Sequence, residues 1–490
     1  MLDGKTIVLG VTGSIAAYKA VDVASHLTQA GAEVDVIMTK AATQFIYPLT
    51  FQTITGRPVA NEMFESAAEF SMEHISLAEA ASLIVIAPAT ANVIAKLAAG
   101  IADDLLCCTV LATKAPVVIA PAMDANMYEN SITQDNLAKL KARDFVIVGP
   151  ISGRLASGKE GLGRFAETDE IVGTICQVLG RNGDLANRYV VVTAGGTHEP
   201  IDPVRYITNR SSGKMVYDLA EAARDRGAKV LLITTPTCLA RPVGVDIIDV
   251  TTAEEMHEAI KAAVPLASAL IMAAAVADYR PLSMAKDKIK KGDDRLTLEL
   301  ERTQDILASA KGHFIKVGFA AESTNLLENA KHKLRQKALD LIVANDITDS
   351  DSGFGADNNR VTIINREGKI DSLPLLPKRE VSGKILDQVA RLLLPESFEI
   401  ELWPPSHIQA GRINIPTELR HNFPDTEVPF KIQADIGDFK VRIKYHQGDK
   451  VDHIHFRELF RAHPQLKAGD RLIIHCVEPM QLYRIEISSK

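Results

Sequence analysis

The sequence predicts an α/β protein with two doubly wound, Rossmann-like domains built on mainly parallel sheets, followed by a small, mostly β C-terminal domain. Three observations support this prediction. Short apolar runs alternate with helical patterns from Lys5 to about Gly180, the alternation restarts after a polar linker, and period-two runs replace it past residue 397. Apolar strands that alternate with helices form a parallel sheet covered by helices on both faces.

The length of the chain agrees with this division. A chain of 490 residues exceeds one ordinary core, because domains usually hold about 100 to 200 residues. The linker GRNGDLANR, from Gly180 to Arg188, is polar and contains two glycines and two asparagines. We therefore expect three domains, at residues 1–187, 188–394 and 395–490.

Composition argues against several classes of protein. The formal net charge is −7, with acidic and basic residues interspersed, which argues against a nucleic-acid partner. No apolar run approaches the ~18 residues of a membrane span, and the start MLDGKTIVLG lacks the features of a signal peptide. Five scattered cysteines without metal-ligand spacing are typical of reduced thiols. We expect a cytoplasmic protein that binds neither nucleic acid nor membranes.

The first domain consists of repeated strand and helix patterns. Its predicted strands are KTIVLG, EVDVIM, SLIVIAPA, APVVIAPA and FVIVGP. Between the first two strands, one apolar helix face is defined by residues at helical spacing, which are Ala17, Val21, Ala24 and Leu27.

The turn after the first strand reads GVTGSIAAYKA. It fits neither the G-x-G-x-x-G dinucleotide loop nor the G-x-x-x-x-G-K-[ST] phosphate loop. Gly10 and Gly13 would let the backbone approach a ligand, and Ser14 at the N-cap offers a hydroxyl beside free backbone N–H groups. This arrangement suits a single phosphate, as on a mononucleotide. A capped turn without a ligand is the alternative.

The second domain repeats the alternation. Its predicted strands are YVVVTAGG, KVLLITTPT, VDIIDV, ALIMAAAV, FIKVGFAAE and LDLIVAND. The domain ends with RVTIINREGKIDSLPLL, a β-ribbon pattern in which Glu367 and Gly368 form the turn.

The C-terminal segment has a different pattern, with alternating runs such as FKVRIKYH and RLIIHCVE. Seven of the 13 histidines lie here, including His453 and His455 in DHIHF. An alternating H-x-H in a strand indicates one solvated face more often than a metal site. The sequence assigns no role to residues 395–490.

Four stretches of the first domain follow strands, where ligands bind in such folds: MTKAATQF, MEHISLAE, APATANVIAKLAAG and APAMDANMY. Taken alone, His74 fits a helix start as well as a catalyst. Together with the opening turn, these stretches resemble the homo-oligomeric flavin-containing cysteine decarboxylases. The resemblance covers most of residues 1–180. It implies FMN as the cofactor, with the binding residues Gly13, Ser14, Thr39, Thr90 and Asn92.

The resemblance also implies a chemical role for His74. Loss of CO₂ from a cysteine carboxylate leaves a carbanion, which requires a neighbouring group that accepts electrons. Oxidation of the thiol to a thioaldehyde creates this acceptor, and a flavin takes the hydride. A histidine titrates near neutral pH, so His74 suits the base that assists the oxidation.

Two positions depart from the family pattern. The substrate loop usually reads PAMN, where the Asn binds the substrate carboxylate, but this chain has Asp124, which repels an anion unless it is protonated or Asn126 replaces it. The flap reads ASGKEGLGR, with Ser157 where the family has a proton-donating Cys. Because the flap glycines and Arg164 are kept, we expect retained binding with a modified reduction step.

The second domain also contains a series of stretches at strand ends or in loops. The first begins at Thr193 and reads TAGGTHEPIDPVRYITNRSSGKM, and the later ones are AAAVADYRP, DKIKKG, GFAAES, KHKLRQKALDLIVANDI and GFGADNN. A glycine turn after a strand, a helix opened by SSGK and several lysines suggest a nucleotide enzyme. In isolation, SSGK is a common helix start and KIKK a common solvated charge run. The ordered set is similar to the cytidylate-forming phosphopantothenate–cysteine ligases. The order of the two domains is similar to the bacterial bifunctional enzymes of coenzyme A biosynthesis, over residues 1–394.

This resemblance implies two consecutive reactions on small molecules. The carboxylate of 4′-phosphopantothenate attacks CTP, with Mg²⁺, to give an acyl cytidylate, and the cysteine amine then displaces CMP. The first domain decarboxylates the product to 4′-phosphopantetheine. The implied residues around the nucleotide are Ala274, Ala275, Asp278, Lys288, Gln304, Asp305, Ile306, Phe319, Lys333 and Lys337. Asn209 and Arg205 are implied to hold the acyl intermediate. The metal ligands stay unassigned.

The resemblance also implies a homo-oligomer. Trimeric contacts between decarboxylase domains and dimeric contacts between ligase domains would combine as a dodecamer.

Three other functions compete with this interpretation. A nicotinamide oxidoreductase fits the fold but not the opening turn. A flavin decarboxylase that acts on peptides leaves the second-domain motifs unexplained. A non-catalytic binding protein fits Asp124 and Ser157, but the presence of His74 counts against it.

Overall fold

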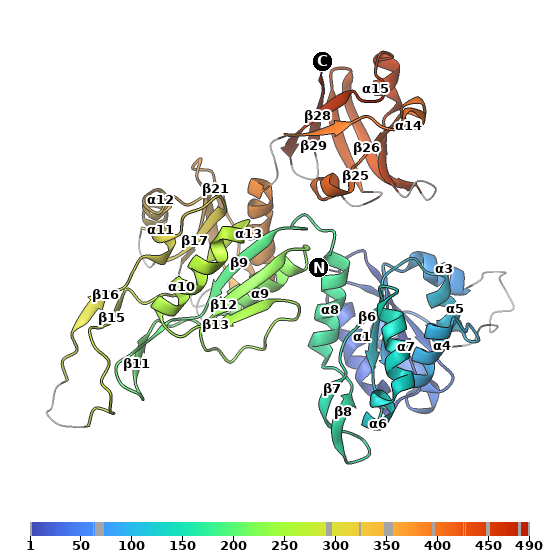
Figure 1. The fold of residues 1–490 in the computed structure, drawn as a ribbon, viewed down its shortest axis with the longest axis horizontal. Coiled ribbons are helices and arrows are strands. Elements are labelled where there is room, and N and C mark those ends of the chain that lie inside the picture. Colours follow the sequence, from blue (N-terminus) through green and yellow to red (C-terminus); the bar gives the residue numbers. More distant parts are fainter. Residues whose placement is uncertain are drawn as a thin grey trace. The chain divides into compact units, whose positions relative to one another are not determined.

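The computed structural model describes residues 2–61, 63, 73–290, 296–322, 325–346, 356–393, 397–424, 426, 428–446, 451–478 and 482–488. The chain forms two compact units, Met1–Leu179 and Gly180–Lys490, which are described separately (Figure 1). The second unit contains two separate main sheets. The boundaries predicted for three domains stay a prediction.

The first unit is built on a six-stranded parallel sheet with the order β3-β2-β1-β4-β5-β6. The strands are β1 (Thr6–Val11), β2 (Glu33–Met38), β3 (Val59–Ala60), β4 (Leu83–Ala89), β5 (Val117–Pro121) and β6 (Val146–Ile147). Strand order reverses between β1 and β4, so the crevice beyond their carboxyl ends is the expected ligand position.

Helices cover both faces of this sheet, as the sequence predicts (Figure 1). One core lies under α1 (Ala20–Gln29), α2 (Pro48–Thr55) and α8 (Thr168–Gly180). The other lies under α4 (Ala91–Ala99), α5 (Leu105–Ala112) and α7 (Ser131–Lys141). The remaining elements are η1 (Ile15–Lys19), η2 (Ala42–Gln44), α3 (Glu73–Ala80), α6 (Ala125–Glu129) and a hairpin of β7 (Ile151–Arg154) and β8 (Glu160–Arg164). On the predicted helix face, Ala17, Ala24 and Leu27 are buried.

The main sheet of the second unit has the order β13-β12-β9-β14-β17-β18-β20-β21. Its strands are β9 (Tyr189–Ala194), β12 (Lys229–Thr234), β13 (Asp246–Asp249), β14 (Ala269–Met272), β17 (Ile315–Glu322), β18 (Leu341–Asp346), β20 (Val361–Asn365) and β21 (Ile370–Ser372). The first six are parallel, and β20 and β21 form the predicted antiparallel ribbon at the edge.

This sheet is also covered on both faces. One core includes α9 (Lys214–Arg224) and α13 (Lys378–Leu393). The other includes α10 (Ala253–Ala263), η3 (Val264–Leu266), α11 (Ile306–Ser309) and α12 (Leu326–Gln336). Three two-stranded ribbons complete the region: β10 (His198–Pro200) with β11 (Tyr206–Thr208), β15 (Tyr279–Pro281) with β16 (Leu300–Arg302), and β19 (Asn358–Asn359) with β22 (Leu376–Pro377).

The C-terminal region is mostly β, as predicted, with a seven-stranded sheet of order β23-β28-β29-β25-β26-β27-β24. Its elements are β23 (Ser397–Glu401), α14 (Pro405–Gln409), β24 (Arg412–Asn414), η4 (Thr417–Asn422), β25 (Pro429–Ala434), β26 (Gly437–His446), β27 (Val451–His455), α15 (Arg457–Ala462), β28 (Arg471–Glu478) and β29 (Leu482–Ser488). Its aromatic core includes Phe423, Phe430 and Tyr483.

The expectation of a solvated histidine face on DHIHF is wrong for His453. This side chain is buried, and its Nε2 lies 3.1 Å from Nε2 of His455. The two rings share one face of β27, and the pattern of the strand alone does not reveal that this face is covered.

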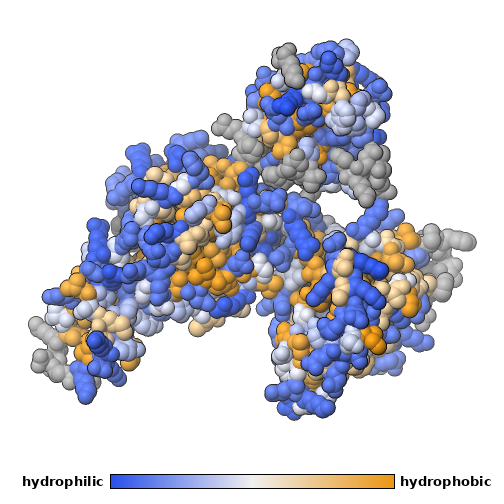
Figure 2. All heavy atoms as spheres, viewed as in Figure 1, coloured by the Kyte–Doolittle hydropathy of each residue, from blue (hydrophilic) through white to orange (hydrophobic). Residues whose placement is uncertain are grey.

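Polar and charged side chains cover much of the face seen in Figure 2, with apolar side chains among them. Of the helices in the described ranges, none combines the length and hydropathy needed to cross a bilayer.

Candidate active sites

The first unit contains a cleft of about 660 Å³ at the carboxyl ends of its central strands. This position is where the reversal of strand order predicts a ligand. The cleft is lined by parts of the opening turn, the turn after β4, the turn after β5 and the β7–β8 hairpin. Sequence-predicted residues among the lining are Gly13, Ser14, Thr90, Asp124, Ser157 and Arg164.

Ser14 and Thr90 occupy the cap positions that the sequence predicts. The Ser14 hydroxyl accepts a hydrogen bond from the backbone N–H of Ala16 at 3.3 Å, and the Thr90 hydroxyl accepts one from Val93 N–H at 3.4 Å. Both hydroxyls therefore lie at the start of a helical segment on the rim of one cleft.

The two glycines of the opening turn have a packing role. A Cβ added to Gly10 would lie 2.5 Å from Leu106 Cδ1, and one added to Gly13 would lie 2.4 Å from Ala41 Cβ. Gly10 therefore makes room for a side chain of α5, and it is not among the residues that line the cleft. Gly13, by contrast, lines the cleft.

Thr12 connects the opening turn to the turn after β4, both of which line the cleft, and sequence analysis missed this role. Its buried hydroxyl donates to the carbonyl of Pro88 at 2.7 Å and accepts from the backbone N–H of Thr90 at 3.1 Å. The partners lie 76 and 78 positions away along the chain. Their sequence separation explains why the turn itself gave no signal for this contact.

The substrate loop and the flap meet directly. Asp124 caps α6 by accepting a hydrogen bond from Asn126 N–H at 3.0 Å, and its other carboxylate oxygen accepts one from the Ser157 hydroxyl at 3.1 Å. The two residues that depart from the family pattern are therefore hydrogen-bonded to each other.

Three cationic side chains line the first cleft: Lys19, Arg154 and Arg164. Arg164 forms an ion pair with Glu167 at 2.6 Å. Arg154 lies on β7 beside the flap turn, a position that sequence analysis did not single out. These charges suit a cleft that takes an anionic substrate.

Four predicted residues are not among those that line this cleft: Thr39, His74, Asn92 and Asn126. Thr39 follows β2, where its hydroxyl accepts a hydrogen bond from Ala42 N–H at 3.3 Å. His74 lies in the first turn of α3, a helix that packs against α5. Asn92 and Asn126 are exposed beside the lining residues Ala91 and Met127.

The second unit contains a cleft of about 680 Å³ at the carboxyl ends of β14, β17 and β18. The lining brings together most of the residues assigned to the nucleotide and the acyl intermediate. These are Asn209, Ala274, Ala275, Asp278, Gln304, Asp305, Ile306, Phe319, Lys333 and Lys337.

Hydrogen bonds hold the loops of this cleft in place. The Asn209 amide donates to the carbonyls of Ala275 at 3.3 Å and Val276 at 3.0 Å. The backbone N–H of Thr303 donates to the carbonyl of Asp278 at 3.0 Å. The loop after β14 is thus tied to two segments that are distant in sequence.

Lysines enter the second cleft from three helices. Lys333 and Lys337 lie four residues apart at the end of α12, and Lys337 forms an ion pair with Asp305 at 2.9 Å. Burial opposes ionisation of Asp305, but the Lys337 hydrogen bond prevails and holds the pKa of its carboxyl below the ordinary value. Lys214 contacts Asp357 on another side of the cleft.

Lys378 and Asn345 also line the cleft, and sequence analysis did not select either of them. Lys378 is buried at the start of α13, and burial, followed by the charge of Lys214, lowers the pKa of its ammonium group. Asn345 Oδ1 is buried without a hydrogen-bond partner among the described residues. A ligand with an N–H or O–H group would satisfy it.

Arg205 and Lys288 are not among the residues that line this cleft. They lie on two chain segments that Asp202 holds together. Arg205 donates to Asp202 Oδ2 at 2.5 Å and to the carbonyl of Ile289 at 2.7 Å, and Ile289 N–H donates to Asp202 Oδ2 at 3.2 Å. Asp202 therefore joins the segment that carries Arg205 to the segment that carries Lys288. Part of the KIKKG motif, from residue 291, falls outside the described residues.

Burial alone would raise the pKa of the Asp202 carboxyl. Hydrogen bonds from Arg205 and from the backbone amides of Val204 and Ile289 outweigh burial and hold this pKa well below its ordinary range. The carboxylate is thus ionised at neutral pH.

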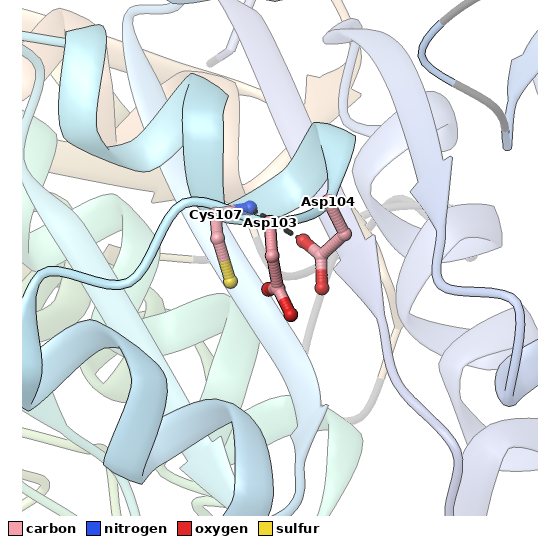
Figure 3. A group of neighbouring side chains, drawn as sticks. All are labelled: Asp103, Asp104 and Cys107. Atoms are coloured by element: carbon pink, nitrogen blue, oxygen red, sulfur yellow. Dashed lines mark hydrogen bonds between the residues drawn. The ribbon is translucent and has the colours of Figure 1, made fainter.

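One group in the described part of the chain has ligand atoms close enough for a metal ion: Asp103, Asp104 and Cys107. Figure 3 shows the two carboxylates and the thiol on one side of the first turn of α5. Lys96 Nζ lies 2.7 Å from Asp103 and 3.2 Å from Asp104, and Asp104 also accepts from Cys107 N–H at 2.8 Å. Burial, with the charge of Asp104, raises the pKa of the Cys107 thiol. A neutral thiol and a lysine-paired acidic group fit a helix cap better than a metal centre.

Comparison with known families agrees with the two clefts. The model described as Flavoprotein matches residues 1–180. The model described as DNA/pantothenate metabolism flavoprotein C-terminal domain matches residues 185–393. Each match ends close to the end of the region that contains one cleft, and neither reaches residues 397–488.

Curated relatives match both regions in one alignment. The coenzyme A biosynthesis bifunctional protein CoaBC of Vibrio vulnificus (strain YJ016) is 46% identical over 398 residues, which cover 80% of this chain and 99% of the relative. The protein of the same description from Bacillus subtilis (strain 168) is 45% identical over 398 residues, which cover 80% of this chain and 98% of the relative.

A solved structure gives a shorter match. It is the crystal structure of the C-terminal domain of a coenzyme A biosynthesis bifunctional protein CoaBC, at 41% identity, 43% coverage of this chain, 98% coverage of that chain and a TM-score of 0.38. The curated relatives carry the assignment, because they align almost end to end with residues spanning both clefts. The chain therefore belongs to the family of coenzyme A biosynthesis bifunctional proteins, which join a flavoprotein decarboxylase of phosphopantothenoylcysteine to a phosphopantothenate–cysteine ligase.

Proposed function

We propose that the second cleft ligates 4′-phosphopantothenate to cysteine at the expense of CTP, and that the first cleft decarboxylates the product with FMN. One observation carries this proposal: residues assigned from separate motifs gather in two clefts, each at the carboxyl ends of a parallel sheet. In the described part of the chain, residues 397–488 line neither cleft.

The side chains of the first cleft fit a flavin mononucleotide. Ser14 and Thr90 offer hydroxyls beside helical N–H groups, and Lys19 adds a cation, which together suit one phosphate. Ile15, Tyr18 and Met127 are exposed apolar side chains of the lining, which suit a planar aromatic ring. When bound, the flavin takes a hydride from the thiol-bearing carbon of the substrate and later returns it.

The protein side chains would bind the substrate and move protons. Arg154 and Arg164 suit the anionic groups of the substrate. We assign the Ser157 hydroxyl to protonation of the substrate after CO₂ has left. We assign His74 to removal of the thiol proton, which requires it to reach the cleft of another copy, because α3 does not line the cleft of its own chain.

This requirement supports a homo-oligomer, for which we propose the dodecamer of trimeric and dimeric contacts. Large apolar side chains are exposed around the opening turn and α2: Ile15, Tyr18, Phe45, Tyr47 and Leu49. Tyr47 is 79% exposed and Leu49 is 68% exposed, which suits an interface between copies better than open solvent.

In the second cleft, two anions must approach each other, because the pantothenate carboxylate attacks the α-phosphate of CTP. Lys333 and Lys337 supply positive charge within the lining. Lys288 would add charge from its loop, together with the Mg²⁺ that we propose to accompany CTP. The Asn209 amide, held against Ala275, would orient the acyl cytidylate for attack by the cysteine amine.

The chain is proposed to work in the cytoplasm. Its five cysteines are free thiols, which suits a reducing compartment.

Omission of cysteine tests the ligase half. With 4′-phosphopantothenate, CTP and Mg²⁺ alone, the protein should release pyrophosphate and retain an acyl cytidylate that mass measurement detects, and later addition of cysteine should convert it. Equal intermediate formation with ATP would contradict CTP as the nucleotide. Pyrophosphate release that is unaffected by a metal chelator would contradict the role of Mg²⁺.

A further inference from the structure

The flap hairpin is docked on the substrate loop. The carbonyl of Gly163 on β8 accepts a hydrogen bond from Met123 N–H at 3.0 Å. A Cβ added to Gly163 would lie 2.2 Å from the Met123 carbonyl oxygen, and one added to Gly161 would lie 2.7 Å from Ala125 Cβ. The two glycines therefore allow β8 to lie directly against residues 123–125.

This docking fixes the position of Ser157 relative to Asp124. Ser157 lies in the turn of the hairpin, and its hydroxyl donates to one Asp124 oxygen at 3.1 Å. The other Asp124 oxygen is held by Asn126 N–H. Both residues line the cleft, so the pair borders the proposed substrate site while remaining open to water at the exposed Ser157.

We propose that Asp124 and Ser157 act as one proton-delivering pair, in which Ser157 protonates the substrate and Asp124 supplies Ser157 with the proton. The inference rests on the proposed decarboxylase function. It assigns Asp124 a role other than binding of the substrate carboxylate, in which the residue alternates between the protonated carboxyl and the carboxylate.

The proton balance defines the step. Loss of CO₂ leaves the electron pair of the broken C–C bond on the substrate as an enethiolate, and the carbon that lost CO₂ must gain one proton. Asp124 first takes a proton from solvent, and its hydrogen bond with Ser157 reverses, so that the carboxyl O–H donates to Ser157 Oγ. Ser157 Oγ–H then gives its proton to the substrate carbon as the Asp124 O–H gives its own to Ser157 Oγ, which leaves the Asp124 carboxylate. The reaction overall takes one proton from water, because a hydrogen replaces the carboxylate.

The pair removes the difficulty of serine as an acid. A serine hydroxyl is far less acidic than a thiol, so proton loss from Ser157 alone would leave an unstable alkoxide. With a carboxylic acid within hydrogen-bond distance, the oxygen of Ser157 regains a proton as it loses one, and no alkoxide forms.

A single-turnover experiment tests the pair. The flavin-loaded protein is mixed without oxygen with 4′-phosphopantothenoylcysteine, and flavin absorbance, CO₂ and enethiol product are followed. In Asp124→Asn and in Ser157→Ala, bleaching of the flavin and CO₂ release should keep their rates. The return of flavin colour should slow by about 10²-fold or more, and enethiol should accumulate. Asn also caps helices well, so Asp124→Asn preserves α6.

Rescue by a thiol distinguishes a proton role from a structural one. In the double variant Asp124→Asn with Ser157→Cys, colour should return nearly as fast as in Ser157→Cys alone, because a thiol needs no carboxyl behind it. Ser152→Ala, an exposed serine on the same hairpin, is the matched control and should behave like the unchanged protein.

Three results would overturn the inference: normal colour return in Asp124→Asn, loss of bleaching in that variant, or failure of the double variant to recover. If the unchanged protein neither bleaches nor releases CO₂, the proposed function fails and the inference falls with it. Flavin content, measured for each variant, separates misfolding from lost chemistry.

Discussion

Asp202 shows how one buried carboxylate can organise a proposed site without lining it. It joins Arg205 to the backbone of Ile289, next to Lys288. Its pKa lies below the unfolded value of about 3.9. The interaction therefore contributes stability that is fully present above about pH 4 and is lost as pH falls toward the lower folded-state pKa.

We predict that Asp202→Asn slows the ligase reaction, because a neutral amide leaves Arg205 without its charge partner and loosens the Lys288 segment. Pyrophosphate release from CTP should fall, while decarboxylation of supplied 4′-phosphopantothenoylcysteine stays unchanged as an internal control. Equal loss of both activities would indicate general unfolding and contradict this local role.

Lys288 and Asn209 should affect different steps of ligation. Lys288→Gln removes a charge proposed to favour carboxylate attack on CTP, so it should block formation of the acyl cytidylate. Asn209→Asp should let the intermediate form and accumulate, because the amide is proposed to orient it for cysteine attack. Quenched samples with and without cysteine, measured by mass, decide the question. Undiminished pyrophosphate release in the Lys288 variant would refute its role.

His74→Asn should keep bound FMN but slow CO₂ release by about 10²- to 10⁴-fold, the usual cost of losing a general base. Flavin absorbance of the purified variant gives binding, and trapped CO₂ gives turnover. Normal turnover would show that another group removes the thiol proton.

At the level of elements, the sequence predicts the parallel strands and both helical layers, because apolar periodicity reflects burial directly. It also predicts the caps at Ser14 and Thr90, which depend on adjacent residues. It does not predict Thr12 as a link between turns, or the burial of His453 and Lys378, because these depend on partners or covering elements far along the chain. The close packing of β8 on residues 123–125 escapes sequence analysis for the same reason.

Gly163→Ala tests the docking of that hairpin. The added methyl group would overlap the Met123 carbonyl oxygen, so β8 must shift and separate Ser157 from Asp124. We expect retained flavin binding with delayed return of flavin colour, in the manner of Asp124→Asn. Return of colour at the unchanged rate would mean that the contact between β8 and the substrate loop does not position Ser157.

At the level of the whole molecule, two proposed active sites lie in two separately packed α/β regions of one chain. The product proposed for the second cleft is the substrate proposed for the first, so one polypeptide would carry out consecutive reactions. The family matches end at residue 393, and the C-terminal sheet has its own aromatic core. Both reactions are therefore assigned to the chain before this sheet.

Product stoichiometry in one reaction tests this account most directly. The unchanged protein is incubated with 4′-phosphopantothenate, CTP, Mg²⁺ and cysteine, and the products are quantified by mass. We predict equal amounts of CMP, pyrophosphate, CO₂ and 4′-phosphopantetheine. Two results would contradict the assignment of two coupled reactions to the two clefts. One is a reaction that stops at 4′-phosphopantothenoylcysteine or at the oxidised enethiol, and the other is CO₂ release without CMP formation.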